Sequence, residues 1–218
     1  MTPARIAELL QPFLGGQPLT PLQLSSISTY IDILLRWNAR INLTAIRDPE
    51  EIITRHFGES LFAARHLFPA SSSVSSVVQA VELADLGSGA GFPGLPIKLW
   101  VPHISVTLIE SNHKKATFLR EVVRALTLTG VNIQNARAET LPAHSYDVVT
   151  LRAVERFEAI LPVAASLVAD GGRLALLIGI TQLAQLPAIL PLHDVSARLP
   201  VPSSSSRLLV VAQRRHEQ

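Results

Sequence analysis

The stretch "ADLGSGAGFPGLP" (84–96) decides the fold, because it sets four glycines directly behind a short apolar run. Its last three glycines, Gly89, Gly91 and Gly94, spell G-x-G-x-x-G, which is typical of dinucleotide sites. Its first three, Gly87, Gly89 and Gly91, spell G-x-G-x-G two residues after an acid, which is typical of S-adenosylmethionine (AdoMet) sites. A tight turn between a strand and a helix also needs glycines, so the pattern by itself predicts a turn and leaves its ligand open.

Outward from the glycines, the sequence alternates between strand and helix patterns. Residues 81–86 form a short apolar strand that ends at the loop, and a Pro-broken helical segment follows. Further strands are predicted at 104–110, 131–139, 146–154, 171–179, 193–201 and 207–215, and helices at 112–128 and 157–170. This alternation predicts an α/β fold with a mostly parallel sheet, helices on both faces and a C-terminal antiparallel hairpin.

The first 68 residues are predicted to form a separate helical cap. Both "TPLQ" (20–23) and "DPEE" (48–51) have the residues of a helix start: a capping side chain, then Pro, then Gln or Glu to close a capping box. The Ser-rich segment 69–80 has no periodic pattern and is predicted to be a linker. Residues 81–218 then form the domain that carries the glycine loop.

Composition excludes several classes of protein. The 218 residues include no cysteine, which rules out disulfides, iron–sulfur clusters, thiolate metal sites and a cysteine nucleophile. The seven histidines have no metal-ligand spacing, so no metal is expected. No 18-residue apolar run and no signal peptide are evident, so we expect a cytoplasmic protein without a membrane span. A net charge of +2 permits an anionic partner without requiring one.

Three features favour AdoMet over a dinucleotide. Asp85 next to the turn would repel a pyrophosphate and attract the sulfonium and ammonium groups of AdoMet. Pro93 and Pro96 remove backbone N–H donors where a dinucleotide site presents a helix N-terminus to phosphate. The predicted final hairpin is also typical of AdoMet-dependent methyltransferases. Glu110, at the end of the second strand, could accept hydrogen bonds from a ribose in either cofactor. The G-x-G-x-x-G register that includes Gly94 is then incidental, and an NAD-dependent oxidoreductase stays as an alternative.

Four segments together carry a more specific resemblance: "WNARINLTAIRDPEEIITRHFGES" (37–60), "DLGSGAGFPGLP" (85–96), "KKATFLREV" (114–122) and "LRAV" (151–154). In this order and spacing, they resemble the RsmG (GidB) family, bacterial methyltransferases that make 7-methylguanosine in 16S, the small-subunit ribosomal RNA. The resemblance covers nearly the whole chain. It implies a Rossmann-like class I AdoMet-dependent methyltransferase domain, with 16S ribosomal RNA or the small ribosomal subunit as partner. Since nothing indicates an obligate interface, we expect a monomer.

The resemblance also implies roles for individual residues. Asp85 would face the methionine end of AdoMet, Glu110 would take the ribose, and Arg152 would stand near the methionine or the target base as the catalytic residue. Departures from the usual family residues are Glu59, Phe92, Glu110 and Leu151. The complete implied cofactor site is Asp85, Gly87, Gly89, Gly91, Phe92, Glu110, Ala138, Glu139 and Arg152.

The implied chemistry makes modest demands. N7 of guanine has a lone pair and no proton, so its methylation needs orientation rather than a general base. Arg152 could donate to the guanine O6 or to a phosphate. The preferred RNA-binding candidates are Arg36, Arg40, Arg47, Arg55, His56, Lys114 and Lys115, and further basic residues are Arg65, Arg120, Arg124, Arg207, Arg214 and Arg215. For His56, a packing histidine is the default interpretation and a substrate contact is the alternative.

Three other functions stay open from the residues. They are a methyltransferase of the same fold that acts on another RNA, a protein or a small molecule, an NAD-dependent oxidoreductase, and a non-catalytic AdoMet sensor.

Overall fold

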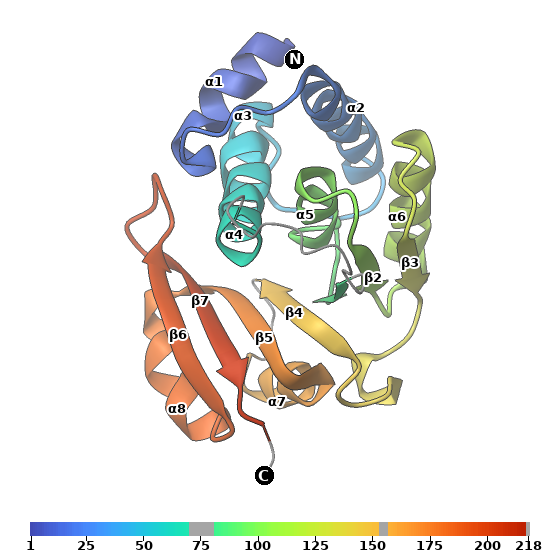
Figure 1. The fold of residues 1–218 in the computed structure, drawn as a ribbon. Coiled ribbons are helices and arrows are strands. Elements are labelled where there is room, and N and C mark those ends of the chain that lie inside the picture. Colours follow the sequence, from blue (N-terminus) through green and yellow to red (C-terminus); the bar gives the residue numbers. More distant parts are fainter. Residues whose placement is uncertain (70–80, 153–156, 217–218) are drawn as a thin grey trace.

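One twisted sheet organises the molecule (Figure 1). The computed structural model describes residues 1–69, 81–152 and 157–216. Within these residues, seven strands form the sheet in the order β3-β2-β1-β4-β5-β7-β6. The strands are β1 (Glu82–Leu86), β2 (Ser105–Ile109), β3 (Val131–Gln134), β4 (Tyr146–Arg152), β5 (Val168–Gly179), β6 (His193–Pro200) and β7 (Arg207–Arg214).

The pairing of the strands confirms the predicted fold class. β1 is parallel to both β2 and β4, β3 is parallel to β2, and β5 is parallel to β4. β7 lies antiparallel between β5 and β6, which makes the predicted C-terminal hairpin. The strand order reverses between β1 and β4, where Asp85 of β1 is paired with Thr150 of β4. In open α/β sheets, ligands bind beyond the carboxyl ends of the strands at such a reversal.

Helices cover both faces of the sheet (Figure 1). They are α1 (Pro3–Leu14), α2 (Pro21–Asn38), α3 (Pro49–Glu51), the π-helical η1 (Ile52–Gly58), α4 (Glu59–Leu67), α5 (Gly94–Trp100), α6 (His113–Ala125), the 3₁₀ turn η2 (Ala138–Thr140), α7 (Phe157–Leu167), the 3₁₀ turn η3 (Ile180–Gln185) and α8 (Leu186–Ile189). The predicted helix starts are present. Thr20 and Gln23 form a complete capping box, and Asp48 accepts a hydrogen bond from the backbone N–H of Glu51.

Several boundaries differ from the sequence prediction, and one lies outside the described residues. The predicted strand 131–139 ends at Gln134, because residues 138–140 turn into η2. The predicted helix 157–170 ends at Leu167, and Val168 already pairs with Tyr146 in β5. The last two residues of the predicted strand 146–154 lie outside the described residues.

The helix that begins after Asp48 is not a regular α-helix throughout, because its middle is the π-helical η1. Apolar spacing marks the buried face of a helix but does not detect one extra residue in a turn. The wide turn holds Arg55 and His56, and π-helical turns occur frequently at functional sites.

The cap and one face of the sheet share one hydrophobic core. Tyr30 of α2 and Phe57 of η1 belong to the same buried cluster as Leu108 of β2 and Phe118 of α6. The opposite face packs on α7 and α8 in a second cluster. The predicted linker lies almost wholly outside the described residues, so the division of the chain at residues 68 and 80 stays a prediction.

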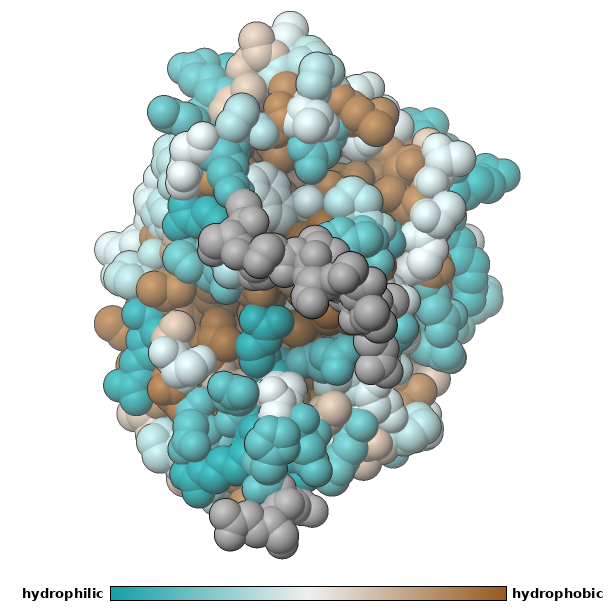
Figure 2. Space-filling model, in the orientation of Figure 1, coloured by the Kyte–Doolittle hydropathy of each residue, from teal (hydrophilic) through white to brown (hydrophobic). Residues whose placement is uncertain are grey.

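The surface of the molecule has both hydrophilic and hydrophobic areas. On the face in Figure 2, hydrophilic residues cover most of the lower part, and hydrophobic residues show across the middle and in places in the upper part. Among the helices of the described ranges, none has the length and apolar character needed to cross a membrane.

Candidate active site

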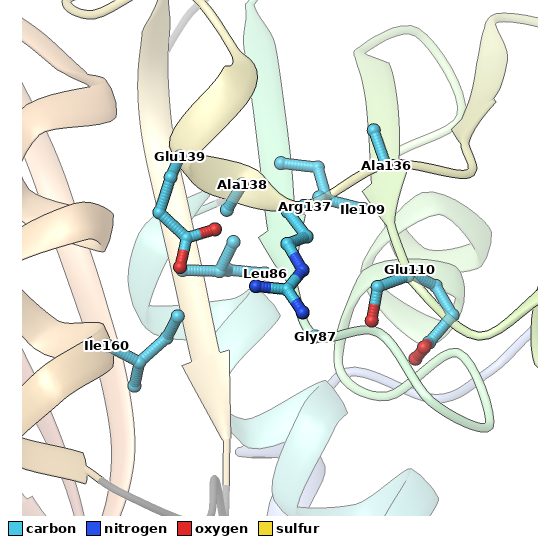
Figure 3. Close-up of a pocket in the computed structure, with 10 residues that line it drawn as sticks. Leu86, Gly87, Ile109, Glu110, Ala136, Arg137, Ala138, Glu139 and Ile160 are labelled. Carbon is cyan, nitrogen blue, oxygen red and sulfur yellow. The ribbon is translucent and has the colours of Figure 1, made fainter.

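A pocket of about 280 Å³ lies beyond the carboxyl ends of β1 and β2 (Figure 3). It is the position that the strand order indicates for a ligand. The structure brings four of the predicted cofactor residues together here: Gly87, Glu110, Ala138 and Glu139. The complete lining is Leu86, Gly87, Ile109, Glu110, Ser111, Ala136, Arg137, Ala138, Glu139 and Ile160.

The glycine loop holds the carboxylate of Glu110 in place. Its Oε2 accepts a hydrogen bond from the backbone N–H of Gly89 at 2.9 Å, and its Oε1 accepts one from Asn112 at 2.7 Å. Each carboxylate oxygen can accept more than one hydrogen bond, so both stay available to hydroxyl groups in the pocket. Gly87 and Gly89 have φ values of +67° and +55°, where a side chain is disfavoured.

Sequence reasoning missed Arg137, although it stands inside the "ARAE" segment. Figure 3 shows its guanidinium pointing into the pocket, between the carboxyl groups of Glu139 and Glu110. The apolar walls Ile109 and Ile160 were not predicted either. Ile109 could have been predicted, because it is the last residue of β2 and strand ends face the ligand. Ile160 could not, because it lies on α7 and reaches the pocket only through tertiary packing.

Asp85 lies behind the glycine loop, fully buried. Its Oδ1 accepts a hydrogen bond from the Thr150 hydroxyl at 2.8 Å, and its Oδ2 accepts one from the Gly94 N–H at 3.2 Å. Burial raises the pKa of Asp85 to about 6, although these hydrogen bonds oppose the shift. A Cβ on Gly94 would come within 2.8 Å of the Asp85 Cβ. Packing therefore requires glycine at this position, although its match to the G-x-G-x-x-G pattern is incidental. Which part of the cofactor Asp85 faces stays a prediction.

The cap reaches the glycine loop through aromatic side chains. The hydroxyl of Tyr30 donates to the backbone oxygen of Ala90, and a Cβ on Gly91 would lie 2.2 Å from that hydroxyl. Phe92 stacks between Tyr30, with ring centroids 5.4 Å apart, and His56, at 4.8 Å. Phe92 and Gly91 are therefore packed under the cap, and neither lines the pocket described above.

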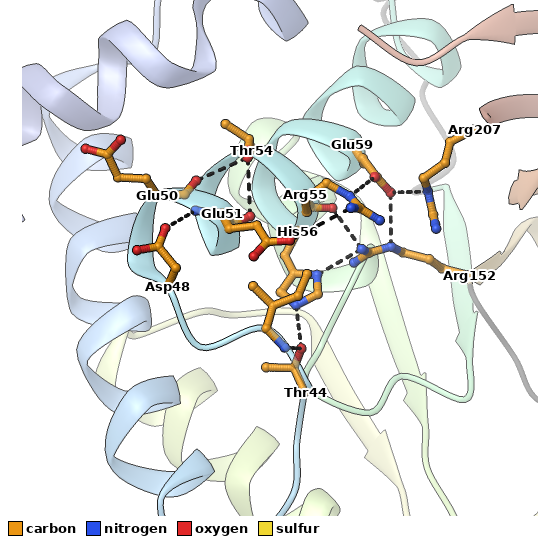
Figure 4. Close-up of polar contacts among 11 residues, drawn as sticks. Thr44, Asp48, Glu50, Glu51, Thr54, Arg55, His56, Glu59, Arg152 and Arg207 are labelled. Carbon is orange, nitrogen blue, oxygen red and sulfur yellow. Dashed lines mark hydrogen bonds and ion pairs between the residues drawn. The ribbon is translucent and has the colours of Figure 1, made fainter. Parts of the chain in front are cut away.

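Arg152, the predicted catalytic residue, joins a group that we name the arginine cluster: Arg55, His56, Glu59, Arg152 and Arg207 (Figure 4). Arg55 is 41% exposed, and the other four side chains are largely buried. Glu59 is 1% exposed and forms ion pairs with Arg55 at 3.1 Å, Arg152 at 3.4 Å and Arg207 at 3.1 Å. Arg152 also donates to the backbone oxygen of Arg55 at 2.8 Å. Its pKa is lowered to about 10 because it is buried, despite the nearby Glu59.

His56 is an acceptor within this cluster. Its Nδ1 lies 2.8 Å from the Arg152 Nη2, and its Nε2 lies 2.8 Å from the Thr44 Oγ1. Because a guanidinium can only donate, Nδ1 must accept, and Nε2 then carries the proton donated to Thr44. Burial, reinforced by Arg152 and Arg55, lowers the pKa of His56 to about 3. This predicted RNA contact is therefore a buried neutral histidine that orients Arg152.

The remaining RNA-binding candidates lie at the surface. Arg36 and Arg40 flank the end of α2, Arg47 precedes α3, and Lys114 is in the first turn of α6; all four are exposed, whereas Lys115 is half-buried. Arg36 lies 3.7 Å from Glu121 of α6 in an ion pair. Across residues 1–69, 81–152 and 157–216, no group of three or more metal-ligating side chains comes together.

The comparisons with known proteins agree with the geometry. The family model for rRNA small subunit methyltransferase G (GidB) matches residues 23–190. The chain belongs to the GidB family. A ribosomal RNA small subunit methyltransferase G of Stenotrophomonas maltophilia is 40% identical over 198 residues, covering 89% of this chain and 88% of the relative. One of Xylella fastidiosa is 41% identical over 191 residues, covering 85% and 84%. This confirms the family predicted from the four sequence segments.

A solved structure shows the fold of this GidB-family chain. The magnesium protoporphyrin IX methyltransferase of Synechocystis, determined with bound SAM, superposes with a TM-score of 0.64 at 15% identity. The match covers 87% of this chain and 97% of that protein. At this identity the likeness shows the fold alone, which is that of AdoMet-dependent methyltransferases and confirms the predicted class.

Proposed function

We propose that this protein transfers a methyl group from AdoMet to N7 of a guanine in 16S ribosomal RNA. The observation that carries the proposal is the pocket beyond β1 and β2, because it sets Glu110 beside the glycine loop in a chain of the GidB family. We further propose that it works as a monomer in the cytoplasm, with 16S RNA or the small ribosomal subunit as its partner.

The pocket residues fit the nucleoside part of AdoMet. Glu110 presents oxygens that the loop has already oriented, and a ribose offers two hydroxyl donors for them. Ala138, Ile109 and Ile160 supply apolar walls for the adenine ring, with Glu139 at the rim. The positive φ of Gly87 lets the backbone approach the ligand with no Cβ in the way.

When bound, AdoMet supplies an electrophilic methyl group on a sulfonium. The protein then needs to hold a guanine N7 in line with that methyl group, and no proton must be removed from N7. His56 fits this requirement because it stays neutral and orients Arg152 rather than acting as a base. Arg152 would position the guanine or a neighbouring phosphate, since a guanidinium donates to both.

A labelled-methyl assay tests the proposal. Purified protein, AdoMet with a labelled methyl group and small subunits from cells lacking this gene should yield labelled 7-methylguanosine, detected by nucleoside mass spectrometry. Glu110→Ala should lose transfer, whereas Glu8→Ala, an exposed acid on α1, should retain it. If the wild-type protein makes no 7-methylguanosine but methylates another nucleoside, a protein or a small molecule, the substrate assignment is wrong.

A further inference from the structure

The charges of the arginine cluster do not balance. Three guanidiniums surround the one carboxylate of Glu59, Arg55 also pairs with Glu51 at 3.9 Å, and His56 is neutral, so one positive charge is left in excess. Arg152 is 8% exposed and Arg207 is 17% exposed, so water screens this excess poorly. A purely structural ion pair would place one cation against one anion, because unpaired buried charge is destabilising.

Hydrogen bonding in the cluster is also incomplete. Arg152 Nε, Arg207 Nε and Arg207 Nη2 are buried and have no hydrogen-bond partner, although both Nε atoms lie near Glu59 Oε2. Both Nε atoms still form ion pairs with Glu59 Oε2, so Arg207 Nη2 is the one of these three donors that needs an explanation, because most buried donors in proteins are paired. An added anion could accept from Arg207 Nη2 and offset the excess positive charge of the two guanidiniums.

The position of the cluster relates it to the candidate active site. Arg152 is the last residue of β4, and Arg207 is the first residue of β7. The Arg152 Cζ lies 5.9 Å from the ring of Phe92 in the glycine loop. No cluster residue lines the pocket that contains Glu110, so the cluster is next to that pocket but separate from it.

We propose that Arg152 and Arg207 form an oxyanion site for a backbone phosphate of the RNA substrate, with Glu59 holding both guanidiniums in position. That the oxyanion belongs to RNA rests on the proposed function. A phosphodiester has two free oxygens and one full negative charge, which suits two guanidiniums. The methionine end of AdoMet has a carboxylate as well as an ammonium group, so cofactor binding has to be measured separately from RNA binding.

Arg207→Met tests the site, because it removes the charge and keeps most of the length of the side chain. Arg198→Met is the matched control, an exposed arginine on the neighbouring strand β6. Protein-free small-subunit RNA should bind Arg207→Met about tenfold more weakly than wild type. The slope of log affinity against log salt should become shallower by about 0.7–0.9, the effect of one lost phosphate contact. Arg198→Met should bind RNA as the wild type does.

Two further measurements identify the anion. Inorganic phosphate should raise the melting temperature of the wild type and of Arg198→Met more than that of Arg207→Met. Calorimetry should show unchanged affinity of Arg207→Met for S-adenosylhomocysteine. Arg207→Lys keeps the charge without the planar fork, so it should recover part of the RNA affinity and serves as the test variant if Arg207→Met does not fold.

The outcomes separate this site from the proposed function. Unchanged RNA affinity and salt slope in Arg207→Met overturn the oxyanion site, even if the wild type makes 7-methylguanosine. Loss of S-adenosylhomocysteine affinity with normal RNA binding also overturns it, since the site would then hold the cofactor carboxylate. If RNA binding depends on Arg207 but no 7-methylguanosine forms, the oxyanion site stands and the proposed reaction fails.

Discussion

When the pH falls from 7.5 to 5, the free energy of unfolding should fall by about 2 kcal/mol more in the wild type than in His56→Asn. His56 has a pKa of about 3 in the folded protein against an ordinary value of 6.5, because it is buried next to Arg152 and Arg55. Below pH 6.5 the unfolded chain therefore takes up a proton that the folded protein does not. The contribution of His56 to stability is complete above pH 6.5 and is lost progressively down to about pH 3.

The value of about 2 kcal/mol follows from the difference between pH 5 and the ordinary histidine pKa of 6.5. Each pH unit in this range costs about 1.4 kcal/mol, so 1.5 units cost about 2 kcal/mol. For a chain of this length, that corresponds to about 4–8 °C in melting temperature. Asp85 has the opposite effect, since its raised pKa makes the folded protein lose stability as the pH rises from about 4 to 6. Because both proteins contain Asp85, the comparison of His56→Asn with the wild type removes its contribution.

Scanning calorimetry at pH 7.5 and pH 5 measures the effect. Asparagine can still accept a hydrogen bond from Arg152 near the position of Nδ1. The substitution itself should therefore lower the free energy of unfolding by the same amount at both pH values. On acidification, His56→Asn should then lose less stability than the wild type. His103→Asn is the control, because His103 is exposed and its replacement should leave the pH dependence as it is. If His56→Asn and the wild type lose the same stability on acidification, His56 is not a buried neutral histidine.

Three other substitutions test the candidate site. Glu59→Gln should lower the free energy of unfolding by about 3–5 kcal/mol, because Arg152 and Arg207 lose their buried counter-charge. Denaturant titration checks this, and a loss below about 1 kcal/mol would contradict it. Asp85→Asn should raise the melting temperature at pH 7.5 but not at pH 4.5, where the wild-type carboxyl is already protonated; an equal change at both pH values would argue against a raised pKa. Glu110→Ala should weaken S-adenosylhomocysteine binding about 10- to 100-fold in calorimetry, through the loss of charged hydrogen bonds to the ribose, and unchanged affinity would place the ribose elsewhere.

Local sequence patterns were sufficient to predict the fold class. Short apolar strands alternating with helical segments indicate a parallel sheet, and the final two strands indicate a hairpin. The glycine loop predicted the turn after β1, and Glu110 at the end of β2 predicted a polar group next to it, because parallel strands end at one edge of the sheet. These predictions succeeded since each depends on residues close together in the chain.

What the sequence determined by itself was therefore the fold, the family and the place of the glycine loop. The tertiary structure decided how the charged residues are used. Asp85 is buried against Gly94 and Thr150, while its place at the cofactor stays a prediction, and His56 contacts Arg152 from 96 residues away in the chain. No periodicity records such contacts, because the charge, pKa and free donors of a buried arginine depend on which distant side chains fold against it.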